Sequence, residues 1–164
     1  MSKRRKHFRA NIYRDSWSLD AAFYKWIRPR LKCYREFVNG WPDQIYPTFE
    51  DFTKDLDEKI VWVDYLYKHE CTNELISEED LAKVWDEALL DKHYPDWRER
   101  IKKAEQDNIN KQNKPQTEST NEVQKMLDKI DIDWVRATKD DLITESLAEE
   151  FGEWFGKRYR CLWW

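Results

Sequence analysis

The chain has 164 residues and a formal net charge of −4, and 38% of its residues are charged while only three are Gly and five are Pro. This length suits one domain with an ordinary core, and so few turn-forming residues exclude a barrel or sandwich rich in Gly and Pro. We expect no general nucleic-acid-binding surface on residues 43–91, which hold fifteen acidic and four basic side chains. We therefore predict a mainly α protein, a small helical bundle of about four to five helices.

Residues 1–14 carry six basic side chains and no acidic one. We predict a solvated basic arm over this range, followed by a single helical domain over residues 15–164. The arm is the one segment from which we expect contacts with phosphates or with an acidic partner. No apolar segment follows the arm, and no run approaches the roughly 20 apolar residues of a membrane span. We therefore expect a cytoplasmic protein without a membrane partner.

The first predicted helix begins at an N-cap, Ser16 or Ser18, and ends at Asn39-Gly40. Pro29 lies inside this helix, and we predict a kink there because proline lacks a backbone donor. Apolar residues at intervals of three and four predict the face that is turned to the core. Its members are Phe23, Ile27, Leu31, Tyr34 and Val38.

Charged side chains on this helix fall into two groups. Asp20 and Arg30 lie by helical phase on or beside the apolar arc, where a charge is rarely buried unless it is paired. Each of them therefore needs a partner: an acidic or basic side chain of another helix, another subunit, or a ligand in a pocket. The second group forms a continuous basic stripe opposite the apolar face. Its members are Lys25, Arg28, Lys32 and Arg35.

Two further N-caps predict the next helices. Thr48 with Asp51 resembles a capping box and opens a helix that runs to about Lys68. Ser77 opens a third helix, which precedes a short segment around Trp97. The predicted buried positions of these two helices are Phe49, Phe52, Leu56, Ile60, Val63 and Tyr67, and then Leu81, Val84, Trp85, Ala88 and Leu89.

The stretch at about 107–121 is almost entirely polar, so we predict a flexible linker there. Residues 123–130 follow with one apolar helical face, and Thr138 is predicted to cap the final helix. The chain ends in Trp163 and Trp164. Because a frayed terminus rarely keeps two exposed Trp, we expect this end to pack on the domain or on a partner.

Side chains that could carry chemistry occur without catalytic or metal-binding spacings. Cys33, Cys71 and Cys161 share no redox or ligand spacing, so we predict free thiols in a reducing cytoplasm. The run His69-Glu70-Cys71 lacks the remaining ligands of a tetrahedral site. Three glycines nearly exclude a phosphate-binding loop, and no nucleophile motif is present. We therefore predict a protein that is not an enzyme and that needs no metal or cofactor.

Motifs at both ends of the chain resemble those of a phage group. The chain carries Trp17-Ser18-Leu19-Asp20, Pro29-Arg30-Leu31-Lys32, Asn39-Gly40-Trp41-Pro42 and a closing Leu162-Trp163. This set resembles a widespread group of small uncharacterised bacteriophage proteins, whereas the middle of the chain departs from them. The resemblance implies a phage product that acts in the cytoplasm of an infected bacterium, as an accessory protein against host functions or defences.

Two main hypotheses of function follow. In the first, the protein is a homo-oligomeric binder that captures a small anionic ligand, such as a nucleotide immune signal. In the second, it is an inhibitor or adaptor that grips a host protein through its acidic middle segment, and a minor virion or assembly role is a third hypothesis. The predicted ligand-binding residues are Arg28, Arg30 and Lys32 for phosphates, Trp26, Tyr34 and Trp41 for a base, and Asp20 beside them.

Overall fold

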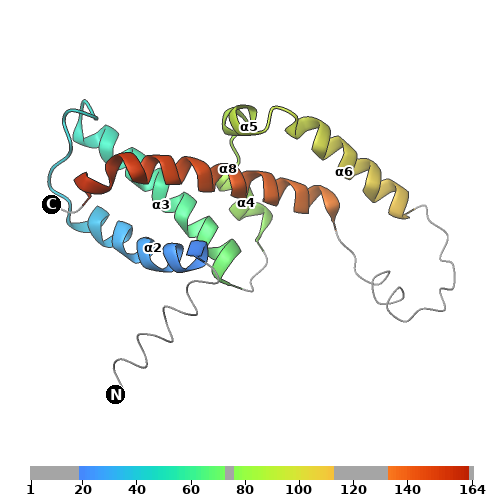
Figure 1. Cartoon of the computed structure of the whole chain (residues 1–164), viewed down its shortest axis with the longest axis horizontal. Helices are drawn as coiled ribbons and strands as arrows, with labels where there is room; N and C mark the ends of the chain where they lie inside the picture. Colours follow the sequence, from blue (N-terminus) through green and yellow to red (C-terminus); the bar gives the residue numbers. More distant parts are fainter. Residues whose placement is uncertain (1–18, 73–75, 113–132, 163–164) are drawn as a thin grey trace, which may run out of the picture. The chain divides into compact units, whose positions relative to one another are not determined.

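A computed structural model of the chain describes residues 19–72, 76–112 and 133–162 (Figure 1). Within these ranges it contains six α-helices, one short 3₁₀ turn and no strand, which confirms the mainly α class but exceeds the predicted number of helices. None of the described helices is both long and apolar enough to cross a membrane. The elements are α2 (Leu19–Phe37), α3 (Phe49–Cys71), α4 (Glu78–Val84), α5 (Glu87–His93), α6 (Trp97–Gln112), α8 (Trp134–Arg158) and η1 (Tyr159–Cys161).

An unexpected break lies at residues 85–86, inside a segment that we predicted as one helix. Trp85 and Asp86 have extended backbones. Asp86 Oδ1 accepts hydrogen bonds from the backbone N–H groups of Ala88, at 2.9 Å, and Leu89, at 3.3 Å. Asp is a favoured N-cap because its short carboxylate reaches such donors. Apolar periodicity continues across the break, so periodicity alone predicts one helix where the structure has α4 and α5.

Contacts divide the chain into two compact units. Unit 1 comprises Met1–Trp85 and Leu147–Trp164, and unit 2 comprises Asp86–Ser146. The two ends of α8 therefore belong to different units. The predicted basic arm, residues 1–14, lies outside the described residues.

The core of unit 1 forms where α2 and α3 pack along one another (Figure 1). Ile27 and Leu31 are buried on α2, as the apolar spacing predicted, and Phe151 joins them from α8. Phe49 was predicted to be buried on α3 but is exposed, because it is the first residue of the helix. The buried apolar residues of α3 are Phe52, Leu56, Trp62, Val63, Tyr65 and Leu66.

Helix α2 continues without interruption through Pro29. Its last residue is Phe37, which agrees with the predicted end at Asn39-Gly40. A bend at Pro29 stays a prediction, and the predicted caps, Ser16 and Ser18, lie outside the described residues.

Side-chain caps set the starts of α3 and α4, as predicted. Thr48 Oγ1 accepts a hydrogen bond from the backbone N–H of Asp51 at 3.1 Å. Ser77 and Asp80 form a complete capping box, in which Ser77 Oγ accepts from the Asp80 N–H at 3.1 Å and Asp80 Oδ2 accepts from the Ser77 N–H at 3.4 Å. This box places Asp80 in the first turn of α4, where it meets Lys68 of α3.

In unit 2, α8 begins earlier than we predicted. Asp133 Oδ1 accepts hydrogen bonds from the backbone N–H groups of Val135, at 3.1 Å, and Arg136, at 3.3 Å. The helix therefore starts at Trp134, and Thr138 lies inside it. The prediction of Thr138 as the cap is wrong because Asp133, five residues earlier, already supplies a capping carboxylate.

The start of the predicted linker is helical, because α6 continues to Gln112. Asn108, in this last part of α6, donates a hydrogen bond to Asp133 Oδ1 at 3.0 Å. A tertiary contact of this kind stabilises a polar helical segment that composition alone predicts to be flexible. The rest of the predicted linker, the predicted helix at 123–130, Trp163 and Trp164 lie outside the described residues.

Candidate functional site

The predicted ligand-binding residues lie on different sides of α2. Arg28 and Lys32 pair with a side chain of α3, whereas Trp26 and Arg30 lie on a solvent-exposed side of the helix. Arg30 donates to the backbone carbonyl of Trp26 at 2.6 Å, and its guanidinium lies 4.6 Å from the centre of the Trp26 ring. Because successive helical residues are turned by about 100°, these two pairs of side chains cannot converge on one small ligand.

Asp20 and Arg30 are both exposed, so the prediction that they lie at a buried face and need partners is wrong. Asp20 lies in the first turn of α2, and Arg30 runs along the helix surface over Trp26. Helical phase gives the direction of a side chain around the axis. Helical phase does not show whether a neighbouring helix lies in that direction, or how much of α2 such a helix covers.

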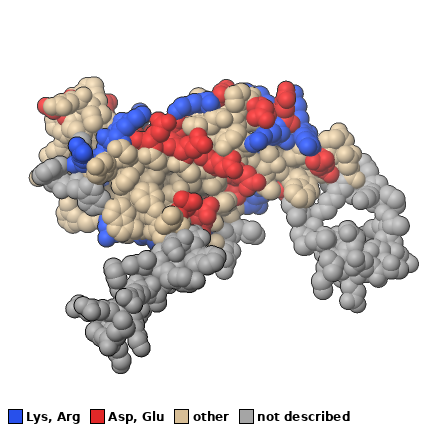
Figure 2. All heavy atoms as spheres, in the orientation of Figure 1, with Lys and Arg blue, Asp and Glu red and all other residues tan. Residues whose placement is uncertain are grey.

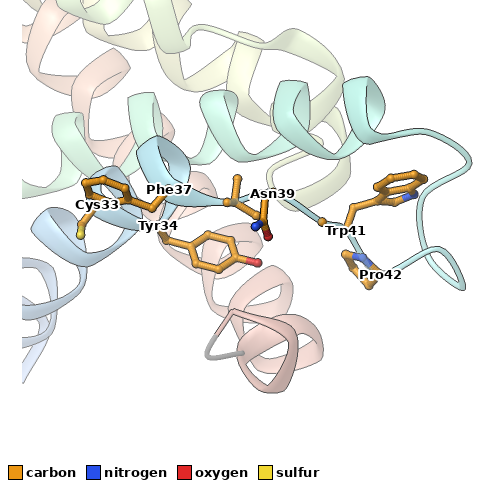
Figure 3. Close-up of a pocket in the computed structure, with 8 residues that line it drawn as sticks. Cys33, Tyr34, Phe37, Asn39, Trp41 and Pro42 are labelled. Atoms are coloured by element: carbon orange, nitrogen blue, oxygen red, sulfur yellow. The ribbon is translucent and has the colours of Figure 1, made fainter.

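Tyr34 and Trp41 line an open groove of about 460 Å³ at the C-terminal end of α2 (Figure 3). Figure 3 shows Cys33 and Phe37 next to each other at one side of the groove and Trp41 on the loop at the other side. Trp41 Nε1 donates to the backbone carbonyl of Tyr46 at 3.1 Å, which holds this loop. No cationic side chain lines the described part of the groove, so it suits an apolar side chain rather than a phosphate.

The basic stripe of α2 meets acidic side chains of α3. Asp64 is shared by two cations, because Arg28 Nε lies 2.5 Å from its Oδ1 and Lys32 Nζ lies 2.7 Å from its Oδ2. Nearer the other end of the stripe, Arg35 donates two hydrogen bonds to Asp57, at 2.6 and 2.9 Å, which raise the pKa of Arg35. Two α3 carboxylates thus take up three of the four stripe cations.

Next to Arg28, a cleft of about 630 Å³ opens beside α3 and α4. A second shared carboxylate lies in its wall: Asp80 accepts from Lys68 Nζ at 2.6 Å and lies 3.7 Å from Lys83 Nζ. Hydrogen bonds from Lys68 and from the Ser77 hydroxyl hold the pKa of Asp80 far below its usual range. Asp80 is therefore a permanent negative charge at physiological pH.

Aromatic rings form another part of the wall of this cleft. The guanidinium of Arg28 lies 4.6 Å from the centre of the Tyr67 ring. Tyr65, which also lines the cleft, is buried. Stacking on a ring fixes the plane of an arginine while leaving donors at its edge for a carboxylate or phosphate.

The two shared carboxylates, Asp64 and Asp80, leave the cleft with a positive excess. The charged side chains that line it are three cations, Arg28, Lys68 and Lys83, and these two carboxylates, so the lining has one more positive than negative charge. This excess stands out in a chain whose net charge is −4. A positive lining favours anions over cations.

A separate polar cluster joins the loop after α2 to α3 and α8. Tyr46 donates to Asp55, Trp154 Nε1 donates to the same carboxylate at 2.6 Å, and Arg158 Nε donates to the Tyr46 hydroxyl at 2.5 Å. Burial, followed by the bond to Asp55, raises the pKa of Tyr46 to about 12. Each of these four side chains bonds within the cluster, so we read it as architecture that anchors the end of α8.

Cys33 and Cys71 are free thiols, as predicted, and the side chain of Cys161 lies outside the described residues. Cys71 Sγ donates to the backbone carbonyl of Ala21 at 3.3 Å, and burial raises the pKa of its thiol. A raised thiol pKa disfavours a nucleophilic role. Across residues 19–72, 76–112 and 133–162, no group of three or more His, Cys, Asp or Glu is placed to hold a metal ion.

Much of the acidic charge in the middle segment, residues 43–91, is locally balanced. Arg98 contacts both Asp91, at 2.5 Å, and Glu87, at 3.1 Å. The acidic surface of this segment that has no nearby cation is therefore smaller than the count of its acidic and basic residues indicates. The other acidic residues of the segment with a basic partner include Asp55, Asp57, Glu58, Asp64 and Asp80.

Sequence reasoning missed Lys68, Lys83 and Tyr67 as cleft residues. Lys68 was expected only to end a helix, and Tyr67 was expected only to be buried. One signal was available, since the capping box at Ser77 and Asp80 also predicts that Lys83, three residues after Asp80, lies on the same side of α4. Nothing local in the sequence brings Lys68 to Asp80.

Comparisons of the chain with protein-family models, with curated proteins and with solved structures found no match.

Proposed function

We propose that the protein is a binding protein, not an enzyme, and that it captures a small anionic ligand of nucleotide type in the cleft beside α3 and α4. The observation that supports this most is the pair of shared carboxylates, Asp64 and Asp80, each in contact with two cations. The cleft volume of about 630 Å³ suits a small molecule. Cations in the cleft suit a nucleotide, whose phosphates pair with positive charge.

The ion pairs at the cleft are suited to exchange with a ligand. The side chains of Arg28 and Asp64 are each 37% exposed, and partly solvated pairs of this kind contribute about 0.2–1 kcal/mol. A phosphate offers more charge and more acceptor oxygens than one carboxylate. It can therefore bind the free edge of Arg28 while Lys32 continues to neutralise Asp64.

Of the predicted ligand set, Arg28 lines the proposed site, and Lys32 lies beside it on Asp64. Lys68 and Lys83 supply the second group of cations, and Tyr67 supplies the ring on which Arg28 stacks. The remaining members of the predicted set, Asp20, Trp26, Arg30, Tyr34 and Trp41, do not line this cleft.

The proposed setting is a bacteriophage accessory protein that withholds a nucleotide signal from the defences of an infected bacterium. This setting rests on the terminal motifs, such as Pro29-Arg30-Leu31-Lys32, and on their resemblance to small phage proteins. A ligand that is merely held, without turnover, agrees with the absence of a catalytic motif in the sequence.

Isothermal titration calorimetry of the full chain at low salt tests the proposal with three probes: a cyclic dinucleotide, adenosine 5′-monophosphate and inorganic phosphate. Arg28→Gln and Lys83→Gln are each expected to weaken binding roughly tenfold, the loss of one charge-assisted hydrogen bond. Arg100→Gln is the matched control, because Arg100 belongs to unit 2 and pairs with Asp96. Failure of all three probes to bind at millimolar concentration, or equal binding by all variants, contradicts the proposal.

A second candidate is an adaptor or inhibitor that docks on a basic host protein. Figure 2 shows acidic side chains gathered in a band along α8. Glu149 and Glu153 of this helix are exposed and lie four residues apart, which places them on one side. Glu149→Lys with Glu153→Lys should abolish capture of a basic partner from a bacterial lysate and leave nucleotide binding unchanged.

A further inference from the structure

A second regular stripe runs along α2, on the side away from Asp64. Its residues alternate at intervals of four and three, the spacing of a helix seam that packs against another helix. We call it the outer stripe. It consists of Leu19, Phe23, Trp26, Arg30, Cys33 and Phe37.

The outer stripe is apolar apart from Arg30, yet most of it faces solvent. Leu19 is 71% exposed, Phe37 is 72% exposed and Trp26 is 41% exposed. Phe23 is half-buried and packs edge-on against Phe155 of α8, with 5.3 Å between ring centres, so it ties the stripe to the core. Large exposed apolar residues in one contiguous row mark an interaction surface rather than an ordinary surface.

The spacing of the outer stripe reads the same in both directions. Its centre is position 28, so that residue 19 mirrors residue 37, residue 23 mirrors residue 33, and residue 26 mirrors residue 30. In a two-fold symmetric interface, residue i of one copy meets residue j of the other and j meets i. Two antiparallel copies of α2 would therefore bring Leu19 to Phe37, Phe23 to Cys33, and Trp26 to Arg30, each twice.

Each of these pairs is chemically suited to contact. Arg30 already lies over Trp26 of its own helix, at 4.6 Å, and a second indole on its other face would complete a sandwich. Leu19 of the second copy would come level with Phe37, beside the groove of about 460 Å³ that Phe37, Cys33 and Trp41 line. In this arrangement Leu19 of the second copy would offer an apolar side chain to the groove.

Charges beside the outer stripe are complementary in the same arrangement. Lys25 and Glu36 lie by helical phase on one flank of the stripe, and within the part of the chain that the structure describes neither has an ion pair. A two-fold axis perpendicular to the helices places the same flank of both copies on the same side of the dimer. Glu36 of the second copy then comes level with position 20, about 7.5 Å along the axis from Lys25, which two long side chains can span. Each dimer would gain this pair twice.

We propose that a second copy of this chain covers the outer stripe, so that two α2 helices pack antiparallel around position 28 in a two-fold dimer. This inference does not depend on the proposed ligand. Arg28 lies about 180° around the helix from the centre of the stripe, so the dimer leaves the cleft of each copy accessible.

Sedimentation equilibrium of the full chain, over micromolar to millimolar concentrations, tests the proposal. We expect a species of twice the 20.3 kDa chain mass. Phe37→Glu should raise the dimer dissociation constant roughly a hundredfold, because each interface carries the change twice. Phe37 is exposed, so helicity by circular dichroism should be unchanged. Ile109→Glu, at an exposed apolar residue of unit 2, is the matched control and should leave the dimer intact.

A charge exchange distinguishes the antiparallel arrangement from any other dimer. Lys25→Glu alone and Glu36→Lys alone should each weaken the dimer, and the double variant should restore it. A chain that stays monomeric at all concentrations overturns the proposal. The proposal is also overturned if such a monomer binds a different protein through the outer stripe. A dimer that survives Phe37→Glu, or that the double variant does not restore, also overturns it.

Discussion

Two sides of α2 carry equally regular apolar spacing and meet different surroundings. On the inner side Ile27 and Leu31 are buried, and the neighbouring cations Arg28 and Lys32 pair with Asp64 of α3. On the outer side most of the outer stripe remains exposed. Spacing identifies the sides of a helix that can be covered. Which side the chain covers itself depends on the carboxylates and apolar rows of the other helices.

The charges on the two sides differ in the same way. Arg28 and Lys32 contact a different helix, so they contribute to the packing of unit 1. Arg30 bonds to Trp26 within its own turn of α2, so it contributes to that helix.

The largest expected effect comes from truncating the inner side. Ile27→Ala removes a fully buried side chain and should lower the free energy of unfolding by about 2–4 kcal/mol, because it loses apolar burial and leaves a cavity. Leu19→Ala, on the outer side, should change it by less than about 0.5 kcal/mol in the monomer. Urea denaturation at low protein concentration measures both. Equal losses would show that the outer stripe is also packed within one chain.

A smaller effect is expected at alkaline pH from Tyr24, which is buried on the inner side. An unfolded tyrosine ionises near pH 10, whereas burial, and then the charge of Asp20, raises the pKa of Tyr24 to about 12. The folded state therefore keeps the proton to higher pH, so stability is full below about pH 9 and falls as the pH rises from 10 to 12. The loss should reach roughly 1 kcal/mol by pH 11.

Urea denaturation of Tyr24→Phe at pH 8 and pH 11 measures this contribution. The variant should lose less stability than the wild type between the two values, and Tyr46 should account for the remaining loss. Identical losses in the two proteins would mean that Tyr24 ionises as freely in the folded state as in the unfolded state.

The smallest expected effect concerns the ion pairs of the inner side. Asp64→Asn removes the carboxylate that Arg28 and Lys32 share, and should lower the free energy of unfolding by only about 0.5 kcal/mol, because the pairs are partly solvated. The same change frees both cations, so phosphate binding should strengthen. Arg30→Gln, on the outer side, should alter neither quantity in the monomer. Weaker phosphate binding by Asp64→Asn would argue that the carboxylate positions Arg28 rather than competes for it.

Local signals predicted much of unit 1. Thr48 and Ser77 cap helices as expected, α2 ends where Asn39-Gly40 interrupts it, and Ile27 lies in the core. These predictions hold because capping and apolar spacing depend on residues within one or two turns of each other. The start of α8 was misplaced because two polar residues, Asp133 and Thr138, both resemble caps, and the earlier carboxylate holds the helix start.

The candidate site was only half predictable. Arg28 and Lys32 stood out as part of a basic stripe, but their shared partner Asp64 is more than thirty residues away in sequence. The approach of Lys68 to Asp80 depends on how α4 folds back on α3. Contacts between residues so far apart have no local periodicity, so they cannot be deduced from one sequence.

By itself, the sequence determined the helical class, the two regular sides of α2 and the high content of charged residues. These properties follow from composition and from the helical repeat. The tertiary structure decided which side of α2 is buried, which cations share a carboxylate and where a cleft opens. Those outcomes depend on the distances between separate helices. Burial favours the side whose charges find partners on α3, and most of the outer stripe stays exposed.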